Sequence, residues 1–179
     1  MEVADAVESH GVELILSITN PLVTDPSMEA LSSRALDGAA LIIASLAFRA
    51  RHRLLVADRC IPGLARHWRR TEDPGVKYPI AKAIQYLCED VRGRTIAVAE
   101  GVVAEFARML PPVNHEVDYS DFVFDDFFAF VTVPDTALKA LYYLSQNTTA
   151  LKQMVEGGIV GAVRDMISTT QLSDDTKSK

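Results

Sequence analysis

Apolar residues recur along this chain in a pattern typical of amphipathic α-helices. Three copies stand out: Ala39-x-x-Ile42-Ile43-x-x-Leu46-Ala47, Ile80-x-x-Ala83-Ile84-x-x-Leu87-Cys88 and Ala137-x-x-Ala140-Leu141-x-x-Leu144-Ser145. Spacings of three and four positions place these residues on one face of a helix. Each copy therefore predicts a helix that buries this face, with small residues that let neighbouring helices approach closely.

A second apolar pattern follows each copy after a polar break and a short helical segment. These second patterns are Ile61-x-x-Leu64-x-x-x-Trp68, Val103-x-x-Phe106-x-x-x-Leu110 and Val160-x-x-Val163-x-x-x-Ile167. The steps from Leu46 to Ile61, from Leu87 to Val103 and from Leu144 to Val160 agree to within one position. Leu46 precedes Leu87 by about 41 residues, a period in the range of helical repeat proteins. This constant spacing predicts a three-helix unit that is copied along the chain.

The copies also carry a family signature. The stretch Ala140-Leu-Tyr-Tyr-Leu-Ser-Gln-Asn147, followed by Met154-Val-Glu-Gly-Gly-Ile-Val-Gly161, resembles the A-L-x-N-L-S and V-x-x-G-G-I-P signatures of the armadillo repeat family. Val98-Ala-Glu-Gly-Val-Val103 and Cys60-Ile-Pro-Gly-Leu64 resemble the same junction. The resemblance implies an all-α, right-handed superhelix, an armadillo-like solenoid with about three and a half repeats and about eleven helices. A HEAT-type solenoid is the closest alternative.

In family terms each repeat has a short first helix, a second helix and a long third helix. We expect a single domain over 1–167, with repeats at about 3–48, 49–90 and 91–147 and a partial repeat at 148–167. Residues 168–179 are polar and are expected to form a disordered tail. The step from Leu87 to Leu144 is longer than the step from Leu46 to Leu87, so the third repeat contains an insertion at about 111–133.

The insertion is acidic and aromatic. No Lys or Arg occurs between Arg108 and Lys139, and five of the seven phenylalanines lie between Phe122 and Phe130. Two interpretations stay open: the rings extend the third helix and pack on neighbouring repeats, or the segment contacts a partner or folds back over the groove. The candidate contact residues are Tyr119, Phe122, Phe124, Asp125, Asp126, Phe127 and Phe128.

A basic block covers the first two expected helices of repeat two. Its candidate patch consists of Arg49, Arg51, Arg53, Arg66, Arg69 and Arg70. Three interpretations stay open: a solvated convex face, a site for phosphate or nucleic acid, and pairing with an acidic partner or with the insertion. The small size of the block and the net charge of −6 disfavour nucleic acid.

Composition and motifs narrow the function classes. The chain is 49% hydrophobic and 23% charged, as soluble globular proteins are. The acidic start and the short apolar runs fit neither a targeting sequence nor a membrane span, which predicts a cytoplasmic or nuclear protein. Cys60 and Cys88 lie in apolar helical patterns, as buried reduced thiols do. Because no metal spacing, phosphate loop or nucleophile context occurs, we expect no enzyme, no metal and no cofactor.

The resemblance also implies where a partner binds. In armadillo proteins the third helices line a concave groove. Two positions of each third helix face this groove, five residues and one residue before the signature Leu. Here these positions hold Leu41, Ser45, Lys82, Tyr86, Lys139 and Tyr143. The Trp and Asn of importin-α-like receptors are absent, which argues against a receptor for nuclear signals. Lys and Tyr suit an extended, partly acidic peptide, as in β-catenin-like grooves.

The leading hypothesis is therefore a protein-binding scaffold or adaptor that uses the groove, the insertion or an open end. One alternative is a structural subunit of a larger complex, or a fragment of a longer solenoid. A second alternative is nucleic-acid or phosphate binding through Arg49–Arg70. An apolar stripe of Val160, Val163 and Ile167, with Ile159 and Met166 beside it, predicts self-association or a neighbouring chain at the C-terminal end.

Overall fold

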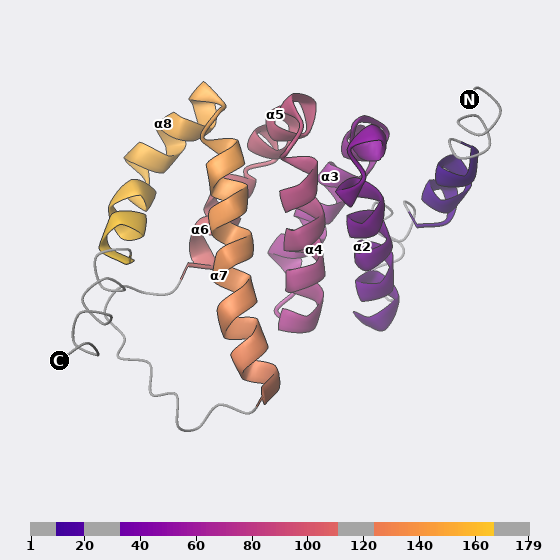
Figure 1. The fold of residues 1–179 in the computed structure, drawn as a ribbon, viewed down its shortest axis with the longest axis horizontal. Helices are drawn as coiled ribbons and strands as arrows, with labels where there is room; N and C mark the ends of the chain where they lie inside the picture. The colour runs from indigo at the N-terminus through magenta and orange to yellow at the C-terminus, as the bar shows by residue number, and fades with distance from the viewer. Residues whose placement is uncertain (1–9, 20–32, 111–123, 167–179) are drawn as a thin grey trace.

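The computed structural model describes residues 10–19, 33–110 and 124–166, and it describes no side chains at 33, 34, 36 and 124–133. Within these ranges all regular secondary structure is helical, which confirms the predicted all-α class (Figure 1). Tyr119, Phe122 and the expected tail at 168–179 lie outside the described residues.

The three long apolar patterns form three long helices that lie side by side (Figure 1). They are α2 (Ser33–Phe48), α4 (Pro74–Leu87) and α7 (Phe124–Leu144). The middle helix, α4, packs against both of the others. Each of the three ends at the same edge of the layer, where the chain turns into its next segment (Figure 1).

Shorter segments cover this layer and extend it at both ends. The other face of the layer packs against α3 (Arg53–Arg70), α5 (Val91–Ala99) and α6 (Val102–Arg108). Beyond α7 lie α8 (Thr148–Glu156) and the helical residues 159–166, and beyond α2 lie the helical residues 10–19 (Figure 1).

Side-chain caps and a proline mark where the helices begin. Asp73 caps α4, accepting a hydrogen bond from the Gly75 N–H at 2.9 Å, and Pro74 is the first residue of that helix. Asp90 caps α5 and Asn147 caps α8 in the same way. Such caps satisfy N–H groups that have no partner inside the helix.

Most of the predicted helix faces are buried. On α4, Ile80 is 2% exposed and Leu87 is fully buried, as the pattern predicts. On α2 the pattern is right for Ile43, which is fully buried, but wrong for Ile42, which is 43% exposed. The reason is that Ile42 borders a cavity between α2 and the helical residues 10–19, so no side chain covers it completely.

The junction predicted at Cys60–Leu64 is wrong. The helix α3 continues through Pro62 without a break. Where helices do break, between α5 and α6 and after α8, the chain has glycines with positive φ, Gly101 at 73° and Gly158 at 71°. The proline ring holds φ in the helical range, so Pro62 costs one hydrogen bond but does not reverse the chain. The second unit therefore consists of a 3-10 turn, η2 (Ala50–His52), followed by α3 and α4.

One glycine is required by a close approach between helices. Gly93 lies where α5 turns against the end of α4, and a Cβ added there would lie 1.9 Å from the Leu87 carbonyl oxygen. No side chain fits at that distance. Gly93 therefore sets how closely α5 follows α4.

Two aromatic rings join α3 to α6 behind the layer. The ring centroids of Trp68 and Phe106 lie 4.7 Å apart with an interplanar angle of 80°. Trp68 is 2% exposed and Phe106 is fully buried. This edge-to-face geometry is one that aromatic pairs favour, and it anchors α6 to the core.

Part of the predicted insertion belongs to α7. Residues 124–133 form the first turns of this helix, so the insertion does extend the third helix along its backbone. The candidate residues Phe124, Asp125, Asp126, Phe127 and Phe128 lie in these turns, and their side chains are outside what is described. Whether they contact a partner stays a prediction.

Candidate functional site

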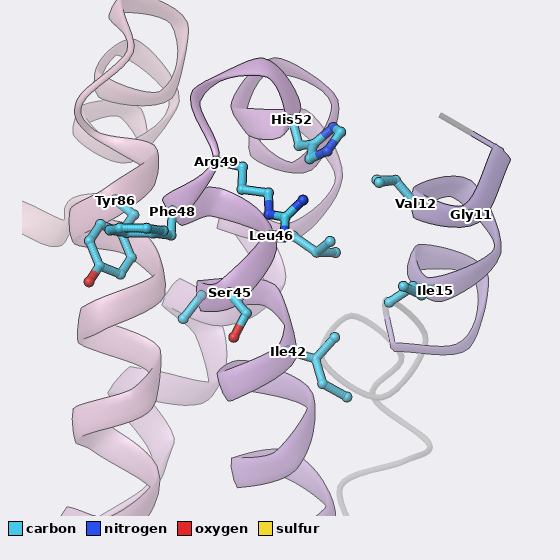
Figure 2. Close-up of a pocket in the computed structure, with 11 residues that line it drawn as sticks. Gly11, Val12, Ile15, Ile42, Ser45, Leu46, Phe48, Arg49, His52 and Tyr86 are labelled. Carbon is cyan, nitrogen blue, oxygen red and sulfur yellow. The ribbon is translucent and has the colours of Figure 1, made fainter. Parts of the chain in front are cut away.

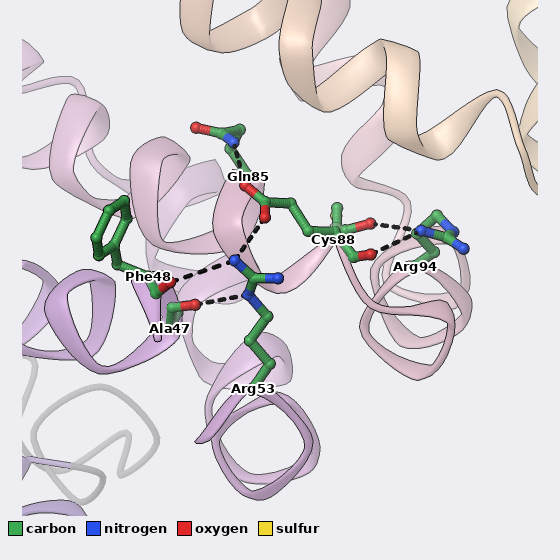
Figure 3. A network of polar contacts seen from close by, with 7 residues as sticks. Ala47, Phe48, Arg53, Gln85, Cys88 and Arg94 are labelled. Carbon is green, nitrogen blue, oxygen red and sulfur yellow. Dashed lines mark hydrogen bonds and ion pairs between the residues drawn. The ribbon is translucent and has the colours of Figure 1, made fainter. Parts of the chain in front are cut away.

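The ends of α2 and α4 are capped by arginines that stand at equivalent positions. Arg53 Nε donates to the Ala47 carbonyl at 2.8 Å, and its Nη2 donates to the Phe48 carbonyl at 3.3 Å (Figure 3). Arg94 Nη1 donates to the carbonyls of Cys88 and Glu89, both at 3.1 Å (Figure 3). The last carbonyls of a helix lack partners within it, so each guanidinium stabilises a helix end.

Arg53 also connects the two helix ends. Its Nη2 lies 2.5 Å from Glu89 Oε2, and the side chains of Arg53 and Glu89 are only 15% and 22% exposed. Gln85 Nε2 donates to the other oxygen of Glu89 at 3.4 Å. The negative charge of the Glu89 carboxylate is therefore paired with Arg53 of the same chain.

Beside this network lies a cavity of about 490 Å³ between the ends of α2, α4 and α7. We call it the lysine–tyrosine cavity, and it is lined by Phe48, Lys82, Gln85, Tyr86, Glu89, Leu138, Lys139, Tyr142 and Tyr143. From the armadillo resemblance we expect Lys82, Tyr86, Lys139 and Tyr143 to face one groove. The structure brings these four together here.

The two lysines of this cavity contact different kinds of neighbour. Lys82 Nζ lies 5.0 Å from the centroid of the Tyr86 ring, a cation–π distance. Lys139 Nζ lies 2.8 Å from Asp135 Oδ2, and this hydrogen bond and charge raise the pKa of Lys139. Lys139 is therefore paired within the chain, whereas Lys82 lies over an aromatic ring.

Aromatic rings supply most of the exposed apolar surface of this cavity. Phe48 and Tyr86 meet edge to face with centroids 5.3 Å apart, and Tyr142 and Tyr143 do so at the same distance. Phe48 is 64% exposed and Tyr142 is 65% exposed. The sequence did not predict Phe48 or Tyr142 at this site, because neither occupies a groove position of the family.

The cavity also holds an unsatisfied acceptor. Gln85 is 2% exposed, and its Oε1 accepts no hydrogen bond within the part of the chain that the structure describes. A buried acceptor without a donor costs about 1–3 kcal/mol. Gln85 therefore borders the cavity with a buried acceptor that has no donor among the described residues.

A second cavity of about 830 Å³ lies between α2 and the helical residues 10–19 (Figure 2). We call it the apolar cavity, and it is lined by Gly11, Val12, Ile15, Ile42, Ala44, Ser45, Leu46, Phe48, Arg49, His52 and Tyr86. The expected groove residue Ser45 is found here. Leu41 is 49% exposed and lines neither cavity.

The six arginines of the candidate patch fall into two groups near opposite ends of α3. Arg53 caps α2, Arg69 Nη1 donates to the Glu100 carbonyl at 2.7 Å, and Arg49 lines the apolar cavity. Since a helix rises about 1.5 Å per residue, Arg53 and Arg70 stand about 25 Å apart at opposite ends of α3. The remaining candidates, Arg51 and Arg66, are also distributed between the two ends. This arrangement does not favour the nucleic-acid alternative.

The apolar stripe expected at the C-terminal end is divided between two environments. Ile159 is buried at 9% exposure and Val163 is half-buried against the core, whereas Val160 is 52% exposed. The reason is the left-handed turn at Gly158, which directs Ile159 toward α6. Met166 is half-buried, and Ile167 lies outside the described residues. Part of the stripe is therefore covered by the core and part of it is exposed, and whether a neighbouring chain binds there stays a prediction.

Both cysteines of the chain are buried thiols. Burial raises the pKa of the Cys60 and Cys88 thiols to about 12, so neither forms a thiolate at neutral pH. Within the described ranges no group of three or more His, Cys, Asp or Glu side chains is placed to hold a metal. No helix there is both long and apolar enough to cross a bilayer.

Comparison with known proteins adds no further constraint on the site. No protein-family model, no curated protein and no solved structure matches this chain.

Proposed function

We propose that this protein is an interaction scaffold, built as an armadillo-like α-solenoid, that binds an extended, partly acidic peptide of a partner across α2, α4 and α7. One observation carries the proposal: four of the six groove residues that the armadillo resemblance implies, Lys82, Tyr86, Lys139 and Tyr143, line one cavity. Two helices that are far apart in the sequence, α4 and α7, thus present the same Lys–Tyr pair to one site.

The charges of the cavity favour an acidic ligand. The chain carries a net charge of −6, yet two lysines line this cavity. Among its described lining residues the one carboxylate is Glu89, which pairs with Arg53, while Lys139 pairs with Asp135 from outside the lining. A carboxylate of the ligand would therefore pair first with Lys82, or with Lys139 in exchange for Asp135, while the tyrosine rings offer flat surfaces with hydroxyl groups.

A selection from a random peptide library tests this function. Nine-residue peptides displayed on phage are selected on the full-length protein, and the affinities of the enriched peptides are measured by fluorescence anisotropy. We expect enrichment of Asp and Glu. We also expect at least tenfold weaker binding to the double variant Lys82→Glu with Lys139→Glu.

The matched control reverses two other lysines. Lys77 lies on α4 and Lys152 on α8, and neither lines the lysine–tyrosine cavity. The double variant Lys77→Glu with Lys152→Glu changes the net charge by the same amount and should bind the peptides like wild type. Failure to select any peptide, or equal losses in both double variants, would overturn the proposal.

A second candidate function is that of a structural subunit held by its ends. It is favoured by exposed apolar side chains at the C-terminal end, where Leu151 is 45%, Val155 61% and Val160 52% exposed. Leaving such side chains in water is unfavourable by about 1.5–3 kcal/mol each relative to burial. A neighbouring chain would remove this cost.

A further inference from the structure

The two cavities share a wall. Phe48 and Tyr86 line both the apolar cavity and the lysine–tyrosine cavity, and their rings meet edge to face at 5.3 Å. Figure 2 shows the Phe48 and Tyr86 rings together at the side of the apolar cavity that faces α4. A ligand that crosses this ring pair therefore passes directly from one cavity to the other.

The cavities differ in chemistry. The apolar cavity is lined by branched aliphatic side chains, including Val12, Ile15, Ile42 and Leu46. The lysine–tyrosine cavity is lined instead by two ammonium groups and three aromatic rings besides Phe48. A cavity of about 150 Å³ with apolar walls already holds a molecule the size of benzene, so about 830 Å³ leaves ample room for a large apolar side chain.

We infer that the groove recognises a two-part peptide motif: one bulky apolar side chain in the apolar cavity, and one carboxylate about three residues away in the lysine–tyrosine cavity. The inference rests on the proposed function and specifies its ligand. The spacing corresponds to one step between neighbouring helices, from α2, which lines the apolar cavity, to Lys82 on α4, because packed helices lie about 8–10 Å apart and an extended chain advances about 3.3 Å per residue.

Charge complementarity supports the same occupant. Lys82 and Lys139 line the lysine–tyrosine cavity, so positive groups lie at the end of the path that receives the carboxylate. A peptide that carries Asp or Glu about three residues from its apolar residue is attracted to this end. A basic peptide with the same apolar residue is repelled.

A glycine allows the apolar cavity to be filled without touching the lysines. Gly11 lines this cavity, and a Cβ added there meets no atom within 4 Å. Gly11→Leu therefore places a side chain in the space that the ligand would use. Gly38 on α2 is also open to a Cβ but lines neither cavity, so Gly38→Leu is the matched control.

The probes are defined nine-residue peptides with a Gly-Ser background, a fluorescein label, two adjacent glutamates and one leucine. The leucine is placed two, three, four or six positions before or after the first glutamate. Anisotropy titrations should show the tightest binding at a separation of about three in one of the two directions. At that separation, replacing leucine by alanine should weaken binding about tenfold or more.

The protein variants separate this inference from the proposed function. Gly11→Leu should weaken the best leucine peptide about tenfold and leave its alanine counterpart unchanged, while Gly38→Leu changes neither. If the leucine position and Gly11→Leu have no effect but Lys82→Glu with Lys139→Glu abolishes binding, the two-part motif is wrong and the proposed binding of an acidic peptide stands. If none of these peptides distinguishes wild type from the lysine variant, both are wrong.

Discussion

Arg53 and Glu89 form an ion pair of 2.5 Å that joins the end of α2 to the segment after α4. The same guanidinium donates to two carbonyls at the end of α2, so one side chain serves three acceptors. Both partners are largely buried, which distinguishes the pair from the exposed ion pair of Arg92 with Asp58. Removing one partner of an ion pair lowers the free energy of unfolding more when the pair is buried than when it is exposed.

We expect Arg53→Met to lower the free energy of unfolding by about 2–3 kcal/mol, because it leaves Glu89 and the last carbonyls of α2 without their donor. Urea unfolding followed by circular dichroism measures this change. Arg92→Met is the control and should cost at most about 1 kcal/mol, since its pair with Asp58 is exposed. Equal losses in the two variants would contradict the capping role.

Gly93→Ala should be among the most destabilising single-methyl changes in the chain. The added Cβ would lie 1.9 Å from the Leu87 carbonyl oxygen, so α5 must move away from α4. We expect a loss of about 2 kcal/mol or more. Gly38→Ala, where the Cβ meets nothing within 4 Å, should instead stabilise α2 by about 0.5–1 kcal/mol. Thermal melts of both variants give the comparison.

Gln85→Met should separate stability from binding. The substitution removes a buried acceptor that has no donor within the described part of the chain, so the melting temperature should stay the same or rise. Peptides selected on wild type should bind the variant more weakly, because Gln85 lines the lysine–tyrosine cavity. A large fall in melting temperature would show that the amide is already satisfied in the free protein.

The two thiols predict how stability depends on alkaline pH. Burial raises their pKa from 9.0 to about 12, so the folded state keeps both protons while the unfolded state loses them. Their contribution is fully present below pH 9 and falls as the pH rises from about 9 to about 12, by up to about 1.4 kcal/mol per unit for each thiol. Cys60→Ala with Cys88→Ala should flatten this decline. At neutral pH a thiol reagent should modify Cys60 and Cys88 only after unfolding.

The exposed end beyond α7 predicts self-association or capture by a neighbour. Val155→Asp with Val160→Asp adds charge to side chains that are 61% and 52% exposed, so the fold should persist. If the end is an interface, light scattering should show a lower mean mass for the variant than for wild type at high concentration. A wild type that stays monomeric at high concentration would contradict self-association. The variant should then have the same mean mass as wild type.

Helix faces could be predicted from the sequence because burial follows spacing. Ala83 and Leu87, and likewise Ala140 and Leu144, are fully buried, since spacings of three and four align them toward neighbouring helices. Where a residue with this spacing is exposed, the reason is the position of its helix within the layer. Ile42 has the same spacing, but it faces a cavity at the outer side of α2.

Two parts of the site could not be predicted from the repeat. Phe48 lies beyond the signature leucine, and its exposure depends on how α2 ends beside Tyr86. Gln85 lies in a helical pattern that marks it as neither groove nor core, and only the packing of α4 buries it. The arginine caps did leave a signal, because Arg53 stands as far after Leu46 as Arg94 stands after Leu87.

The edge-to-face contact of Trp68 with Phe106 gives the protein an internal optical reporter. The chain has a single tryptophan, so its whole indole emission comes from this buried place between α3 and α6. Trp68 lines neither the apolar cavity nor the lysine–tyrosine cavity, so we expect its emission to stay blue-shifted if a peptide binds there and to shift to the red only when the helices separate. One fluorescence spectrum can thus tell a variant that has lost its ligand from one that has lost its fold.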